Sequence, residues 1–439
     1  MQKKNLFFAL AASAMLFTAC SSDEPVVNGP DNGANAQEIA IAVSNINNLG
    51  SRAGRPLEGS EAKHTIENVR VIITNNTDNK VVHTLDLDWV AVSSPYSNGK
   101  EYTVKLTGDN KLDEGNYTAY AIGYPNSSGY TDKASKAYFA LAKGDTFDGN
   151  IDLGYSVNTN NFGEEIFAGS HAITVGKDKG FKASLVLNRQ VAGTFGYFTE
   201  IPYVEGARYL FLEASASNSR LVLGKFLNTD INTNGDNAID PVVNGYTAAS
   251  TKVIYKIDLN TWFTKIEEAK GADGEPNGLI DVKNWKNPYS KTENGKTVYT
   301  KAFKKGSVFA GTFVIPFEKT SGETFTLKLA KDESGTQVVR TWNVTLPNKG
   351  QVGTYNLTAL NETGAWADAV SVTDTPSNFS VLRNNLYTIG KKINANPKDP
   401  EDPEPDPDDP DEPEPLNTKQ NLEIKVNHNW SVIYNMGVD

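Results

Sequence analysis

Few residues of this chain have the types and spacing that catalysis requires. The 439 residues include one Cys and only four His, at positions 64, 83, 171 and 428. A single Cys excludes an intrachain disulfide, and scattered His leave little for a metal site or a catalytic triad. The sequence contains no GxSxG elbow, no HExxH motif and no P-loop. We therefore expect no catalytic residue and no cofactor, and we predict that the protein is not an enzyme.

Two loops have part of the spacing of calcium ligands. The loop that begins at Asp230 matches the start of an EF-hand loop, but its twelfth position is Pro241, where a bidentate Glu belongs. The loop that begins at Asp273 has Asn284 at that position. Because Asn, Asp and Gly also dominate ordinary turns, we interpret both loops as turns and expect no metal site.

Cys20 lies where a lipid could be attached. Two lysines precede an apolar stretch from Leu6 to Phe17, an order typical of a secretory signal. The residues Thr18-Ala19-Cys20 resemble a bacterial lipobox, which implies cleavage before Cys20 and lipidation of its sulfur. The alternative is an ordinary signal peptide with an incidental Cys. We expect a signal peptide over residues 1–19 and a lipid-anchored precursor in the outer membrane.

Charge is concentrated in one segment near the C-terminus. The chain has a net charge of -11, and residues 397–415 alone hold ten acidic residues, eight Pro and one Lys. A nucleic-acid partner is not expected, because phosphate binding needs a cationic face. Alternating Pro and acid favour an extended spacer, which at about 3.1 Å per residue would reach on the order of 60 Å. We predict an acidic, Pro-rich linker over residues 397–420.

Short strands account for most of the remaining sequence. Apolar residues alternate with polar ones in runs bounded by Asn, Gly, Asp and Ser, and helical periodicity is scarce. Many short antiparallel strands indicate β-sandwiches or barrels. We predict an all-β protein with two sandwich domains, over residues 53–180 and 181–396, and place the boundary at the glycine-flanked segment 176–180.

A strand before the first domain is followed by a site for proteolysis. Over Gln37–Ile46 the apolar residues Ile39, Ile41 and Val43 fall on one face. Arg52 and Ala53 follow among small residues, in a segment of the kind that proteases cut. Arg55 is a poorer site, since Pro56 follows it. We predict that residues 20–52 are a removable propeptide, cleaved between Arg52 and Ala53.

The C-terminal segment alternates over 17 residues, Leu422–Val438. Its large apolar side chains share the even-numbered face, with His428 as the exception, and the opposite face is mostly polar. The even-numbered residues that we expect to be buried are Leu422, Ile424, Val426, Trp430, Val432 and Tyr434. Left in water, such a strand would favour aggregation, so it must be buried. We predict that residues 421–439 form a donor strand, which the linker carries to another molecule.

These two strands suggest one mechanism of assembly. Removal of the first strand would open a groove of unpaired backbone in the first domain, and the C-terminal strand of another copy could fill it by β-strand addition. A contact of this kind is head-to-tail and does not close on itself, so it would build a filament.

Several short motifs then resemble the bacterial fimbrillins that build type V pili, and most of all the shaft subunit of short, or minor, fimbriae. The motifs are Thr18-Ala19-Cys20, Arg52-Ala53, Gly115-Asn116-Tyr117, Tyr124-Pro125-Asn126, residues 165–170 (EIFAGS), residues 187–192 (LNRQVA) and residues 379–389 (FSVLRNNLYTI). The acidic linker and the final Trp-containing strand complete the set. The resemblance implies transthyretin-like sandwich domains, lipoprotein export, processing by an arginine-specific protease, strand-exchange assembly with anchor and tip subunits, and a role in adhesion.

The main alternative is a surface glycan-binding lipoprotein. Six Trp could provide stacking faces for sugars, and Trp262, Trp285 and Trp366 lie in irregular stretches where they could be exposed. That function explains the signal and the sandwich domains. It explains neither the segment around Arg52 nor a spacer that ends in an apolar strand.

Overall fold

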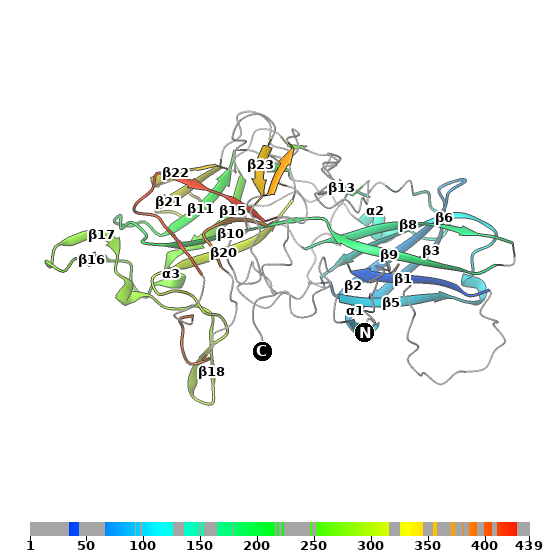
Figure 1. Cartoon of the computed structure of the whole chain (residues 1–439), viewed down its shortest axis with the longest axis horizontal. Coiled ribbons are helices and arrows are strands. Elements are labelled where there is room, and N and C mark those ends of the chain that lie inside the picture. Colours follow the sequence, from blue (N-terminus) through cyan, green and yellow to red (C-terminus); the bar gives the residue numbers. More distant parts are fainter. Residues whose placement is uncertain are drawn as a thin grey trace, which may run out of the picture.

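The computed structural model confirms the all-β prediction and arranges the strands in two sandwich domains that lie side by side along the longest axis (Figure 1). None of the helices in the described part of the chain has the length and apolar character that a membrane span needs. The structure describes residues 35–43, 66–92, 94–96, 99–125, 136–147, 149, 151–152, 165–177, 179–215, 217–218, 222–223, 246–247, 252–315, 325–345, 354–357, 370–373, 381, 386–392, 399–405 and 411–427.

The N-terminal domain is one eight-stranded sheet folded onto itself. Its strand order is β3-β2-β6-β8-β9-β1-β5-β4, and β8 and β9 are paired only at Phe167–Arg189 and Ala168–Asn188. Apolar residues of β2, β6 and β8 therefore face those of β1, β5 and β9 across a common core. The elements are β1 (Gln37–Val43), β2 (Asn68–Asn75), β3 (Val81–Asp88), α1 (Trp89–Val92), β4 (Ser94–Tyr96), β5 (Gly99–Leu106), η2 (Gly108–Asn110), β6 (Gly115–Tyr124), α2 (Lys136–Ala140), β7 (Ile151–Asp152), β8 (Phe167–Val175) and β9 (Phe181–Arg189).

The C-terminal domain packs two five-stranded sheets around a larger core. One sheet has the order β20-β10-β25-β28 with β26 also paired to β10, and the other has the order β15-β11-β21-β22-β27. The elements are β10 (Ala192–Thr199), β11 (Tyr209–Ala214), β12 (Ser217–Asn218), β13 (Val222–Leu223), β14 (Tyr246–Thr247), β15 (Lys252–Asp258), α3 (Leu259–Trp262), β16 (Glu268–Lys270), β17 (Pro276–Ile280), η3 (Val282–Asn284), β18 (Ser290–Glu293), β19 (Lys296–Tyr299), β20 (Val308–Val314), β21 (Phe325–Ala330), β22 (Val338–Thr345), β23 (Thr354–Leu357), β24 (Val370–Thr373), β25 (Leu386–Ile389), β26 (Glu414–Pro415), β27 (Asn421–Glu423) and β28 (Lys425–Asn427).

The boundary between the domains lies about ten residues later than the sequence indicated. Strand β9 belongs to the first domain because it pairs with β1 and β8, so the division falls at Gln190 and Val191 rather than at residue 180. The N–H of Gln190 donates to Ile166 O at 2.7 Å, and Val191 packs with Ile315 in a cluster that also contains residues of the first domain. Glycine-flanked segment 176–180 is instead the turn between β8 and β9.

The acidic Pro-rich segment differs most from the prediction. Where the structure describes it, at residues 399–405 and 411–416, it packs along the C-terminal domain instead of extending as a free spacer. The N–H of Tyr299 donates to Pro400 O at 2.6 Å, and Lys296 pairs with Glu401 at 2.6 Å. Lys392 pairs with Asp411 at 2.5 Å, and both side chains are almost fully buried. We call residues 399–416 the strap; lysines of its own domain supply the counter-charges that the sequence pattern alone did not place.

Candidate functional site

Strand β1 lies in the middle of its sheet although it comes first in the chain. It pairs antiparallel with β5, from Gln37–Leu106 to Ala42–Glu101, and parallel with β9, from Gln37–Phe181 to Val43–Leu187. Both neighbours are distant in sequence, so β1 belongs to no hairpin. Its removal would leave a slot with two unpaired strand edges, at β5 and at β9, which we call the β1 slot.

The inward face of β1 is fully buried, as the alternation predicted. Ile39 and Ile41 have no exposed surface, and Val43 is 4% exposed. The residues between them are partly exposed on the outer face. At about 1.5–3 kcal/mol for each buried side chain, these three residues contribute on the order of 5–9 kcal/mol to folding.

A polar contact fixes the first residue of the strand. The side-chain amide of Gln37 donates to Leu112 O at 2.8 Å and accepts from Leu112 N at 2.7 Å, and Gln37 is buried. One amide thus satisfies both backbone groups of Leu112, which is itself buried. Beside this contact, burial raises the pKa of Tyr117, and the carboxylate of Asp113 adds to the shift. The phenol is therefore neutral at physiological pH, and its hydroxyl donates to Asp113 O at 3.2 Å.

The chain approaches Gly180 closely where β1 begins. A Cβ atom on Gly180 would lie 2.0 Å from Ala36 O and 2.6 Å from Ala36 N. The N–H of Phe181 donates to the same carbonyl at 2.8 Å. Only glycine permits this approach, so the β8–β9 turn is shaped to admit the backbone that leads into the slot.

The C-terminal segment begins inside its own domain. Strand β27 pairs parallel with β22, and β28 pairs antiparallel with β25 in the opposite sheet. The chain changes sheets at Ile424, whose N–H donates to Thr345 O at 2.8 Å. Leu422 and Ile424 are each 2% exposed and belong to the domain core. The prediction that residues 421–439 as a whole leave their own domain is therefore wrong for residues 421–427, because two open sheet edges bind them.

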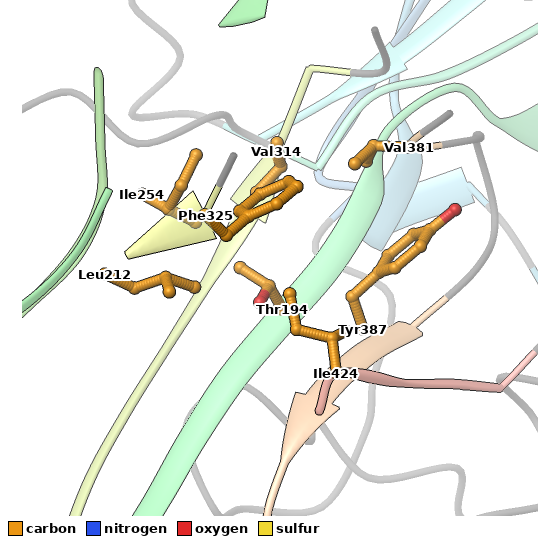
Figure 2. A pocket seen from close by; sticks show the side chains of 8 residues that line it. All are labelled: Thr194, Leu212, Ile254, Val314, Phe325, Val381, Tyr387 and Ile424. Carbon is orange, nitrogen blue, oxygen red and sulfur yellow. The ribbon is translucent and has the colours of Figure 1, made fainter. Parts of the chain in front are cut away.

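A small apolar cavity lies between the two sheets beside this segment (Figure 2). Ile424 lines one side together with Thr194 of β10 and Tyr387 of β25. The remaining lining residues are Leu212, Ile254, Val314, Phe325 and Val381. Ile424 thus closes the edge of the sandwich and fills space that would otherwise extend this cavity.

The other proposed site residues have different outcomes. The backbone of Val426 lies in β28 and pairs with Tyr387. Cys20, Arg52 and Ala53 lie outside the described residues, as do Trp430, Val432 and Tyr434. For those six residues the sequence predictions stand as predictions.

The loop at Asp273 is a turn of the β16–β17 hairpin. Asp273 accepts from the N–H of Glu275 at 3.1 Å, and Asn277 accepts from Leu279 at 3.0 Å. No group of three or more potential metal ligands is found in the described part of the chain. The loop at Asp230 lies outside that part.

Two of the three tryptophans considered as sugar platforms are packed against the core. Trp262 is 3% exposed, and its ring lies edge-on to Phe303. Trp285 donates from Nε1 to Ser307 O at 2.7 Å and packs on the same core. Trp366 lies outside the described residues. The described tryptophans therefore give no specific support to glycan stacking.

Two features of the β1 slot were missed in the sequence. They are the amide contact of Gln37 and the close approach at Gly180. The available signal was a Gln at the start of an otherwise apolar alternation, since a polar residue on a buried face must find hydrogen-bond partners. Leu112 could not be identified as that partner, because it lies 75 residues away.

Comparison with known proteins relates the chain to solved structures alone. No family model and no curated protein matches it. It is similar to a candidate adhesin from Bacteroides ovatus, with 11% identity, coverage of 82% of this chain and 90% of that one, and a TM-score of 0.39. A fimbrial assembly protein from Parabacteroides distasonis gives 10%, 82%, 92% and 0.34 in the same order. The fimbrial anchor protein Mfa2 from Porphyromonas gingivalis gives 11%, 70%, 81% and 0.32.

These neighbours are fimbrial and adhesion proteins, the class that the sequence motifs also resemble. All three TM-scores lie below 0.5, so the likenesses say nothing about which residues of this chain act in assembly.

Proposed function

We propose that the protein is a structural subunit of a surface fimbria that serves adhesion. It is exported as a lipoprotein through Cys20, cleaved between Arg52 and Ala53, and polymerised by strand exchange. The single observation that carries the proposal is the position of β1, a central strand that belongs to no hairpin and precedes a cleavable segment.

Loss of β1 creates a strong demand for a replacement strand. The slot would expose the backbone of β5 and β9 and the apolar contacts of Ile39, Ile41 and Val43. A strand from another copy would restore both ladders and the buried face at once. Cleavage thus makes assembly favourable only after β1 has left.

The donor is the part of the C-terminal segment beyond the domain's own strands. Residues 421–427 are held by β22 and β25, so the exchanged strand is 428–439. Trp430, Val432 and Tyr434 recur at the spacing of Ile39, Ile41 and Val43. A chain with both a removable strand and a donor strand suits the shaft of a fimbria, between an anchor and a tip.

The test compares two arginines that lie three positions apart. Purified precursor, its Arg52→Ala variant and its Arg55→Ala variant are treated with an arginine-specific protease. We expect the wild type and Arg55→Ala to form a ladder of multimers whose subunits begin at Ala53. Arg52→Ala should stay monomeric, because β1 remains covalently attached.

N-terminal sequencing and sedimentation supply the readouts. Multimers whose subunits retain residues 37–43 would contradict the processing step. A fully cleaved protein that releases β1 and still stays monomeric would contradict strand exchange itself.

A further inference from the structure

We propose a defined register and direction for the incoming strand: His428 of one copy takes the position of Gln37, and the strand runs in the direction of β1. The inference rests on the proposed function and specifies the partner surface. Trp430, Val432 and Tyr434 then replace Ile39, Ile41 and Val43 in turn.

The first argument concerns Leu112. When β1 leaves, the buried N–H and C=O of Leu112 lose the amide of Gln37. An incoming strand that places an apolar side chain there would leave both groups buried without that partner, which is costly. The slot therefore selects a strand with a hydrogen-bonding side chain at this position, followed by apolar residues at steps of two.

The C-terminal segment has one such residue. On the even-numbered face from Leu422 to Val438, His428 is the only polar side chain. A neutral imidazole has one N–H donor and one nitrogen acceptor, so it can serve the carbonyl or the N–H of Leu112. Aligning His428 with Gln37 places Trp430, Val432 and Tyr434 over the three apolar positions of β1.

The second argument concerns direction. Strand β9 runs from Phe181, at the pole of the domain remote from the C-terminal domain, to Arg189 at the domain junction (Figure 1). Because β1 is parallel to β9, its Gln37 end lies at the remote pole. A strand from another copy meets this pole without crossing the acceptor's own C-terminal domain. Running like β1, it inserts with its N-terminal residue beside Gly180, where the backbone has room.

This register leaves no free chain between the two molecules. Asn427 of the donor pairs with Leu386 of its own β25, and the next residue lies in the acceptor. The C-terminal domain of the donor must therefore abut the β8–β9 turn of the acceptor.

Engineered disulfides test the register directly. In β1, Glu38 is opposite Lys105 and Ala42 is opposite Glu101. The proposal places Asn429 at the first position and Ile433 at the second, so Asn429→Cys with Lys105→Cys should cross-link subunits, as should Ile433→Cys with Glu101→Cys. Directly opposed antiparallel residues have the Cα separation that a disulfide requires. The only natural Cys, Cys20, lies in the segment that cleavage removes.

The crossed pair, Asn429→Cys with Glu101→Cys, is the control for direction. Polymers that cross-link through this pair, or that form without cross-linking through either expected pair, would overturn the register and leave strand exchange intact. Failure of unmodified cleaved protein to polymerise would instead reject the proposed function.

Substitutions at His428 test the contact itself. His428→Gln restores the amide and should support polymer yield equal to or above that of the wild type. His428→Leu should lower the yield by about tenfold or more, because Leu112 loses its partner. Asn429→Leu makes a similar polar-to-apolar change on the opposite face and should have little effect. Equal yields from His428→Leu and Asn429→Leu would contradict the assignment.

Discussion

Strand β1 and the segment of β27 and β28 are two short, alternating strands at opposite ends of the chain, and they are held in different ways. Strand β1 fills a slot within one sheet and has seven consecutive partners along β9. The C-terminal segment has three partners on β22 and three on β25, and it joins the edges of two sheets. The first is a central strand of a sandwich, whereas the second closes the sandwich at its side.

The difference shows why alternation alone does not identify an exchangeable strand. Both segments bury apolar residues completely, with Ile41 at 0% and Ile424 at 2% exposed. What distinguishes them is covalent and topological context. Strand β1 precedes a cleavable segment and can leave as a unit, while Leu422 and Ile424 are anchored in a core of their own domain.

Truncation at two points should break this comparison with the largest effect. Deleting residues 421–439 removes Leu422 and Ile424 and should lower the free energy of unfolding of the C-terminal domain by about 3–6 kcal/mol. Deleting only residues 428–439 should leave that free energy unchanged and abolish polymerisation. Chemical denaturation of the monomer and sedimentation after cleavage provide the two measurements.

The two deletions act as controls for each other. Equal stability of both truncated proteins would mean that β27 and β28 contribute nothing to their own domain. Normal polymer from the shorter deletion would exclude residues 428–439 as the donor strand.

The strap provides a second, smaller effect on the same segment. Lys392 and Asp411 have side chains 2% and 0% exposed, and Lys392 Nζ also lies 5.1 Å from the ring centroid of Phe303. Lys392→Met deprives a buried carboxylate of its charged partner and should cost about 3–5 kcal/mol. We expect a lower thermal midpoint and proteolysis within the strap.

Lys391 offers a matched comparison one residue away. Its partner Glu412 is 65% exposed, so Lys391→Met should cost under about 1 kcal/mol. Combining Lys392→Met with Asp411→Leu should recover most of the stability, because no unpaired charge then stays buried. A double variant as unstable as Lys392→Met alone would indicate that the strap is held by other contacts.

The sequence predicted what local pattern determines. Alternation at Ile39, Ile41 and Val43 placed a buried strand correctly, and the abundance of such runs placed the protein among all-β sandwiches. The even-numbered burial of Leu422 and Ile424 was also correct, with Glu423 exposed between them. These features depend on a period of two residues, which a sequence displays directly.

The features that were missed depend on contacts between distant residues. The strap was expected to be extended by its own charge, but Lys392 and Lys296 compensate parts of it from elsewhere in the domain. The domain boundary was placed too early because a glycine-rich turn marks the end of a hairpin as readily as the end of a domain. The contact between Gln37 and Leu112 spans 75 residues, a distance over which no local pattern operates.

The smallest expected effect concerns the two faces of the donor strand. Period-two geometry places Val432 on the face that is proposed to enter the slot and Ser431 on the opposite face. Val432→Asp would insert a charge among the apolar contacts that Ile41 makes in the precursor. An unpaired buried charge costs several kcal/mol, and about 3 kcal/mol already corresponds to more than a hundredfold loss of polymer.

Ser431→Asp adds the same charge to the outer face, where Ala40 is partly exposed in β1. Its polymer yield should stay within about threefold of the wild type, since surface substitutions usually change stability by no more than 0.5 kcal/mol. Because charge and chain length are matched, the two variants differ only in the face that they alter. Equal yields would mean that the strand is not held in a pleated slot, and the equivalence of β1 with residues 428–439 would fail, whereas a difference confined to Val432→Asp would extend the buried face of β1 to the donor strand.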